Sequence, residues 1–224
     1  TLDVVSSVVE HVEDLGADMI VIATHGRGGL RRILSGSIAQ QVLASSTVPI
    51  LLVRPKETGD PPAFCCRRIL VPLDGSKLGE TAIPLAEALG AEIILFQVIE
   101  PPVTTYGVPQ SDMNYEALKG YEKEIKPFFL AYLDDLAKPL KERRISISAA
   151  TGFGSPANEI VDYAKANAVD IITMSSHGRS GIGRWVFGSV TDKVLHAGET
   201  LVLVVYPQRV SEGEKAMPRV SRAR

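Results

Sequence analysis

The sequence predicts a doubly wound α/β fold: a five-stranded parallel sheet of strand order 3-2-1-4-5, occurring in tandem. Three observations predict it. Short apolar runs alternate with helical segments over the last two thirds of the chain. A long segment near the amino terminus recurs near the carboxyl terminus, and turns rich in Gly and Ser follow the first and fourth predicted strands of the second copy.

The repeat divides the chain. His25–Pro55 aligns without a gap against His177–Pro207, an offset of 152 residues, with 12 identical positions. The alignment extends upstream, where residues 16–23 match residues 168–175. We therefore predict the carboxyl-terminal part of a first domain at 1–55, a linker at 56–66, a complete second domain at 67–207 and a basic, disordered tail at 208–224.

The second copy begins with a strand at Arg68–Leu73, followed by a turn cluster and a helix over 78–89. Glu92–Val98 is almost wholly apolar, as expected of a parallel strand buried on both faces. After a Pro-rich loop, a long helix is expected over Tyr115–Arg143, with a break at Pro139.

A third strand is expected at Ile145–Ala150, and Ser155-Pro156 then has the residues of a helix start, with Ser as N-cap and Pro in the first turn. Val169–Met174 and Thr200–Val205 complete the five strands. A helix over Ser189–His196 separates the last two.

The first copy is incomplete by comparison. It has a helix at Leu2–Leu15, a strand at Met19–Thr24, a helix at Ser37–Ser45 and a last strand at Ile50–Val53. Counterparts of the first three strands are missing, so we expect either a fragment of a longer tandem protein or strands supplied by another chain. The last strand offers an edge for pairing with the second copy, as an intramolecular pseudo-dimer, or with another molecule, as a homo-oligomer.

The composition of the chain indicates which binding partners and which cellular compartment to expect. The net charge is −2, so nothing favours nucleic acid or an anionic membrane, and a nucleic-acid-binding role for the basic tail is the lesser alternative. The apolar runs fall well short of a membrane span. The two cysteines, Cys65 and Cys66, are adjacent and indicate reduced linker thiols in a cytoplasmic protein rather than a disulfide framework, with a redox role as the lesser alternative.

The chemistry is expected where strand order reverses, between the first and fourth strands of the second copy. The loops there are 71–76 and 175–181. Gly178 and Gly188 allow backbone amides to approach an anion closely and to adopt positive φ, and the helix beginning at Ser189 adds unpaired N–H groups and its dipole. Phosphate would repel Asp74, which therefore suits a ribose hydroxyl or a Mg²⁺ ion, or else caps the following helix.

This arrangement resembles the universal stress protein family. Members that bind ATP carry Gly-x2-Gly-x9-Gly-Ser/Thr; Gly178 and Gly188-Ser189 match it, whereas Ser175 replaces the opening Gly. Val-Pro-Leu-Asp-Gly-Ser at 71–76 is also typical of the family. The resemblance implies an adenine-nucleotide α-hydrolase-like fold that binds ATP or AMP. The implied nucleotide-binding residues are Pro72, Leu73, Asp74, Val98, Ser175, Gly178, Arg179, Gly188, Ser189, Val190 and Thr191, with weaker first-copy equivalents at Gly26, Arg27, Gly36 and Ser37.

Other features of the sequence allow competing interpretations. His177 has no evident acid or nucleophile beside it, so a turn or interface histidine is favoured over a catalytic one. Gly152-Phe153-Gly154-Ser155-Pro156-Ala157 matches a dinucleotide-binding fingerprint but follows the third strand rather than the first. No general base is evident, which favours slow ATP hydrolysis at most. The preferred function is a nucleotide-binding stress-response module, against a nucleotide-free dimerising scaffold and an adenylating transferase.

Overall fold

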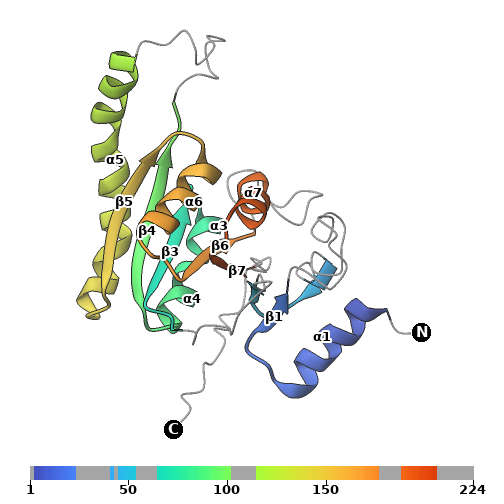
Figure 1. The fold of residues 1–224 in the computed structure, drawn as a ribbon. Coiled ribbons are helices and arrows are strands. Elements are labelled where there is room, and N and C mark those ends of the chain that lie inside the picture. Colours follow the sequence, from blue (N-terminus) through green and yellow to red (C-terminus); the bar gives the residue numbers. More distant parts are fainter. Residues whose placement is uncertain are drawn as a thin grey trace.

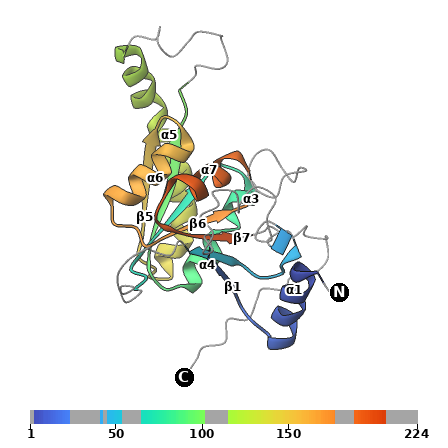
Figure 2. The same ribbon diagram turned by 45° about the vertical axis from the view of Figure 1, so that its right-hand side comes forward.

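The computed structural model of the protein describes residues 3–23, 41–42, 45–53, 65–101, 115–176 and 188–205. Within these ranges one seven-stranded sheet has the order β1-β2-β7-β6-β3-β4-β5 (Figures 1 and 2). The strands are β1 Ile20–Ala23, β2 Ile50–Val53, β3 Arg68–Leu73, β4 Glu92–Ile99, β5 Ile147–Phe153, β6 Ile171–Ser175 and β7 Leu201–Val205. The helices are α1 Val4–Leu15, α3 Lys77–Glu80, α4 Ile83–Ala88, α5 Tyr115–Glu142, α6 Pro156–Ala166 and α7 Ser189–Ala197.

The second copy has the predicted strand order. Its five strands lie as β5-β4-β3-β6-β7, which in chain order is 3-2-1-4-5, and all neighbouring pairs among them are parallel. The order reverses between β3 and β6, which pair through Ile69↔Ile171 and Leu70↔Ile172. The predicted doubly wound fold is therefore confirmed, and its switch point lies where the sequence places it.

The two copies meet through their last strands. β2 pairs antiparallel with β7 of the same chain, through Ile50↔Val204, Leu51↔Leu203 and Leu52↔Val202. β1 continues the sheet beyond β2 as a parallel neighbour. The sheet is thus parallel within each copy and antiparallel at the single junction between the copies.

Helices cover both faces of the sheet (Figures 1 and 2). One core cluster joins α1, α6 and α7 to the sheet through residues that include Val5, Ile160 and Val194. The other joins α4 and α5 to the opposite face, through residues that include Ile83 and Leu133. Strands β3, β4 and β6 lie between these two layers, which explains their almost uninterrupted apolar sequences.

The helix expected over 78–89 is two short helices, α3 and α4, separated by Thr81 and Ala82. Pro84 lies in the first turn of α4, and its ring nitrogen cannot donate to the carbonyl four residues earlier. A continuous helix would need that bond, so the segment divides there. The amphipathic spacing predicts the helical segment but not this division.

Two other expectations about the elements were wrong. Helix α5 does not break at Pro139 but continues through both Pro127 and Pro139 to Glu142. Buried Leu133, Ala137 and Leu140 pack this part of the helix on the sheet, and that packing offsets the lost backbone hydrogen bond.

The third strand is also displaced from its expected position at 145–150. It runs from Ile147 to Phe153 because it pairs with the whole of β4 up to Ile99↔Phe153. Ile145 lies instead in the turn that follows α5, where its amide donates to the carbonyl of Leu140 at 3.1 Å. Most of the predicted first-copy helix at 37–45, most of the linker and the tail lie outside the described residues, and residues 41–42 and 45 are helical as predicted. The domain boundaries remain predictions.

Among the described helices, none combines the length and apolar character that a membrane crossing requires.

Candidate functional site

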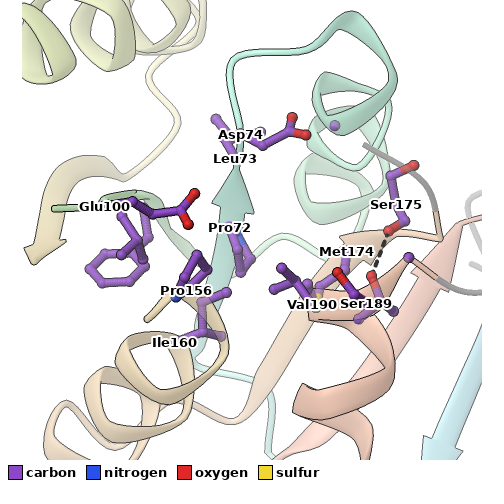
Figure 3. A pocket seen from close by; sticks show the side chains of 15 residues that line it. Pro72, Leu73, Asp74, Glu100, Pro156, Ile160, Met174, Ser175, Ser189 and Val190 are labelled. Atoms are coloured by element: carbon purple, nitrogen blue, oxygen red, sulfur yellow. Dashed lines mark hydrogen bonds between the residues drawn. The ribbon is translucent and has the colours of Figure 1, made fainter. Parts of the chain in front are cut away.

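A crevice opens beyond the carboxyl ends of β3 and β6, where the strand order reverses (Figure 3). Its volume is about 200 Å³, somewhat below the roughly 300–1,000 Å³ usual for small-molecule pockets. Strand ends supply most of its wall, and α3, α6 and α7 supply the remainder. The lining residues are Pro72, Leu73, Asp74, Gly79, Phe96, Val98, Glu100, Pro156, Ile160, Met174, Ser175, Gly188, Ser189, Val190 and Thr191.

The amino-terminal end of α7 forms one wall. Gly188 is its N-cap, and the amide of Asp192 makes the bond to the Gly188 carbonyl, at 3.0 Å. The amides of residues 189–191 precede any carbonyl of their own helix that could accept from them. No side chain caps this end, so three N–H donors and the positive end of the helix dipole line the crevice.

Two hydrogen bonds hold α7 against β6. The buried hydroxyl of Thr191 donates to the carbonyl of Ser175 at 3.2 Å, shown as the dashed line in Figure 3. The amide of Gly188 donates to the carbonyl of Ser176 at 2.7 Å. The helix amides are therefore held in a fixed position relative to the strand end, which is the condition for a preorganised anion site.

Gly188 does not need a conformation reserved for glycine. Its φ and ψ are −64° and 153°, an extended conformation open to any residue, so the freedom of glycine to adopt positive φ is not used at this position. A Cβ there would meet the Ser176 carbonyl oxygen at 3.4 Å, which is an ordinary contact. The value of a glycine at 188 is the open space that it leaves in the crevice.

Asp74 is held by the turn that follows β3. Its Oδ1 accepts from the Ser76 amide at 3.0 Å and from the Ser76 hydroxyl at 2.6 Å. Ser76 in turn is the N-cap of α3, because its Oγ accepts from the Gly79 amide at 3.0 Å. The alternative that Asp74 caps the following helix was wrong, since Ser76 is the N-cap; Asp74 holds Ser76 in place and also lines the crevice. A Cβ on Gly79 would lie 2.8 Å from Asp74 Oδ1, so a glycine there makes room for the carboxylate.

The opposite end of the crevice is apolar. Phe96 is fully buried and packs against Tyr163, with ring centroids 4.4 Å apart. Ile160 from α6 lies at this end, and Met174 from β6 adds an apolar side chain beside Val190; both are buried (Figure 3). A flat, largely apolar body fits between these side chains.

The backbone of β4 also faces this end at Val98. Amides and carbonyls alternate sides along a strand: the amide of Glu92 bonds Arg67 on the β3 side, and the carbonyl of Ile99 bonds Gly154 on the β5 side. The carbonyl of Val98 is therefore directed to the β3 side. Pairing between β3 and β4 ends at Leu73↔Gln97, so this carbonyl points past the end of β3 toward the crevice.

The structure brings nine of the predicted second-copy residues into this one crevice. They are Pro72, Leu73, Asp74, Val98, Ser175, Gly188, Ser189, Val190 and Thr191. The other predicted residues lie outside the described part of the chain, as does His177. They are Gly178 and Arg179 in the second copy and Gly26, Arg27, Gly36 and Ser37 in the first.

Sequence reasoning missed six lining residues. Glu100 and Met174 lie at or just past the ends of predicted strands, so the rule that ligands bind at strand carboxyl ends could have found them. Pro156 and Ile160 lie on a helix that follows an outer strand, and Phe96 lies inside a strand. For these three, as for Gly79 behind Asp74, the sequence carries no local signal.

The dinucleotide-like turn at 152–157 serves a different purpose. Added Cβ atoms on Gly152 and Gly154 would lie 2.9 and 3.0 Å from the carboxylate oxygens of Glu159. The turn therefore accommodates this carboxylate rather than a pyrophosphate. Burial raises the pKa of the Glu159 carboxyl above its ordinary value, although a hydrogen bond from the Phe153 backbone opposes the shift.

The linker cysteines differ from each other. Cys65 is exposed, and its sulfur accepts from Arg67 Nε at 3.3 Å. Cys66 is half-buried, and burial raises the pKa of its thiol. Across the described ranges no three His, Cys, Asp or Glu side chains are grouped so that they could hold a metal ion.

The strand order and the crevice at its reversal define a doubly wound α/β protein of the type that binds ligands at strand carboxyl ends. The family model for "Universal stress protein family" matches residues 2–54 and 66–206. The chain belongs to the universal stress protein family.

Individual relatives agree with this assignment. Universal stress protein Rv2005c of Mycobacterium tuberculosis is 27% identical over 201 residues, which cover 84% of this chain and 61% of the relative. The chain thus spans about three fifths of the length of that relative. The solved structure of MJ0577, a universal stress protein of Methanocaldococcus jannaschii, matches with a TM-score of 0.52 and 27% identity over 65% of this chain and 99% of its own.

Several solved structures match across both copies. A universal stress protein from Archaeoglobus fulgidus covers 90% of this chain with a TM-score of 0.56, and the match covers 64% of that protein. At 19% identity this likeness concerns the fold alone.

Proposed function

We propose that the crevice between β3 and β6 binds an adenine nucleotide, ATP or AMP, and that the protein senses or stores this nucleotide in a stress response. The observation that carries the proposal is the position of the α7 amino terminus. Its amides of residues 189–191 line the same crevice as the apolar wall of Phe96, Ile160 and Met174. A ligand with an anionic end and a flat apolar end matches both.

The free energy available from hydrogen bonds at this site is sufficient for micromolar binding. Hydrogen bonds from these amides to a charged phosphate each contribute about 1.5–3 kcal/mol. Three or four of them reach the roughly −8 kcal/mol of a micromolar complex. Asp74 would face a ribose hydroxyl or a Mg²⁺ ion that arrives with the nucleotide. Gly178, which belongs to the family motif, would add a further amide to this end, and the sequence offers Arg179 either as a cation beside the phosphates or as a surface residue.

The test is mass spectrometry of any ligand retained by the freshly purified protein, combined with thermal shift assays against ATP, AMP and GTP. We expect the adenine nucleotides to raise Tm and GTP to have a smaller effect. Gly188→Val should weaken this shift, because its methyl groups would enter the crevice while its backbone remains in a conformation favourable for Val.

The control for this variant is Gly120→Ala on the exposed part of α5, where an added Cβ meets nothing within 4 Å. It should leave nucleotide binding unchanged. Unaltered melting of the unmodified protein with all three nucleotides would contradict the proposal.

A second function has its own supporting observation. The antiparallel junction between β2 and β7 already joins the two copies as a pseudo-dimer. This favours a nucleotide-free scaffold if the thermal shift assays show no nucleotide binding. In that case Gly188→Val would be without effect on any partner that the protein retains.

A further inference from the structure

Glu100 occupies a distinctive place in the crevice. It follows β4 directly, and it is exposed, yet it lines the crevice beside Val98. Figure 3 shows its carboxylate turned toward Pro72 rather than away into solvent. Among the residues that the structure describes, no hydrogen bond or ion pair involves the Glu100 carboxylate.

The lining side chains near Glu100 are apolar, so Glu100 is the polar side chain at that end of the crevice. Phe96, Val98, Pro156, Ile160 and Met174 present carbon or sulfur to the crevice, whereas the hydroxyls and the other described acid lie at the α7 and α3 end. The carbonyl of Val98 points into the same region. A ligand edge placed here therefore meets two acceptors, a carbonyl and a carboxylate, and no side-chain donor from the described lining.

We infer that Glu100 selects the base of the bound nucleotide by accepting a hydrogen bond from the exocyclic 6-amino group of adenine. This inference rests on the proposed nucleotide site. An amino group has two hydrogens, one for the Val98 carbonyl and one for the Glu100 carboxylate. A 6-oxo purine in the same position would bring its oxygen against both acceptors, which is repulsive, so hypoxanthine and guanine are disfavoured.

Because Glu100 is exposed, water weakens this contact relative to a buried one. We expect Glu100→Ala to reduce ATP affinity about three- to tenfold and to raise the affinity for ITP, whose base is hypoxanthine, because the variant removes one of the two acceptors that repel its 6-oxo group. Glu100→Gln should also lower the ATP-to-ITP affinity ratio relative to the unmodified protein, because its amide oxygen can still accept from the 6-amino group of ATP while its amide N–H can donate to the 6-oxo group of ITP. Both variants change an exposed side chain, so neither should alter the fold.

The experiment is calorimetric titration of the full chain and both variants with ATP, ITP and GTP. Glu199→Gln, an exposed change in the loop before β7 and at the amino ends of the strands, is the matched control and should keep the original ratios. The supporting result is a preference for ATP over ITP in the unmodified protein that falls in both Glu100→Ala and Glu100→Gln.

Three results would overturn the inference. An ATP-to-ITP ratio that both variants leave unchanged would remove Glu100 from base selection while leaving the nucleotide site intact. GTP binding as tight as ATP binding, and dependent on Glu100, would show that another edge of the purine is read. An unmodified protein that binds none of the three would overturn the nucleotide site itself, and the role of Glu100 with it.

Discussion

Leu51 and Leu203 face each other across the antiparallel junction of β2 and β7 and occupy equivalent positions of the internal repeat. Their neighbours pair reciprocally, Ile50 with Val204 and Leu52 with Val202. In the repeat Ile50 is equivalent to Val202 and Leu52 to Val204, so the two pairs are related by exchange of the copies. A pseudo-two-fold axis therefore passes between the two leucines. The same relation places α1 and its equivalent α6 on one face of the sheet.

The first prediction concerns this junction. Leu51 is half-buried and packs against the α4–α5 side of the sheet, so Leu51→Glu would place a charge in an apolar contact at a cost of about 1–3 kcal/mol. We expect hydrogen exchange to show lost amide protection in β1 and β2 while β3, β4 and β6 keep theirs. Val21→Glu is the control, because Val21 is 60% exposed. Equal loss of protection across all strands would show that the two copies do not unfold separately.

The second prediction concerns the bond from Thr191 to the Ser175 carbonyl. Thr191→Val keeps the shape but removes the donor, and should lower the free energy of unfolding by about 1 kcal/mol. For a chain of this size that corresponds to about 2–4 °C in Tm. Nucleotide affinity should fall as well, because the α7 amides lose one of their supports.

The control for Thr191 is Thr81→Val. Its hydroxyl makes a similar bond, to the Leu78 carbonyl at 2.6 Å, but in an exposed turn, so the loss should be smaller. Thr191→Ser should restore part of the stability. Equal effects of the two valine variants would mean that the bond between β6 and α7 has no special importance.

The third prediction concerns the room that Gly79 leaves for Asp74. In Gly79→Ala the new Cβ would lie 2.8 Å from Asp74 Oδ1, so the carboxylate must turn away from its bonds to Ser76. We expect weaker ATP binding by titration with a change in unfolding free energy of no more than about 1 kcal/mol, since alanine also favours the helix. Asp74→Asn retains an acceptor for Ser76 and should keep the fold. ATP binding unchanged in both variants would exclude Asp74 from ligand contact.

The fourth prediction concerns Gly152 behind the apolar wall. An added Cβ would lie 2.9 Å from Phe96 Cζ and 3.1 Å from Glu159 Cβ. Phe96 is fully buried and cannot move freely, so Gly152→Ala should cost about 1–3 kcal/mol. Denaturant unfolding measures the loss. Gly120→Ala, in the open part of α5, should instead stabilise the protein by up to about 1 kcal/mol. A change in unfolding free energy of the same sign in Gly152→Ala and Gly120→Ala would contradict the packing argument.

The fifth prediction follows from Glu159. Because burial raises the pKa of this carboxyl in the folded state, its contribution to stability is fully present below the ordinary glutamate pKa and is lost as the pH rises through the raised value. Glu159→Gln imitates the protonated form. We expect the Tm of the variant to approach that of the unmodified protein near pH 4 and to exceed it at pH 7. Parallel pH profiles would show that the carboxyl titrates alike in the folded and unfolded states.

Several features were predictable because they depend on local pattern. Arg68–Leu73 and Ile50–Val53 are strands with the predicted bounds, since continuous apolar runs bounded by turn residues leave little alternative. The repeat and the alternation of strands and helices together predict the strand order. The position of the crevice was therefore also predictable, because Asp74 and Ser175 lie at the ends of strands that a doubly wound sheet must place side by side.

The sequence by itself therefore determined the fold class, the duplication and the polar end of the crevice, all of which arise from periodicity and from backbone requirements within short segments. Tertiary structure alone decided the rest. Phe96, Ile160 and Met174 meet only through register and helix packing, α5 continues through Pro139 only because the sheet holds it, and Leu51 meets Leu203 only because two edges pair. In each case the stabilising contact joins residues distant along the chain, and local sequence carries no record of such contacts.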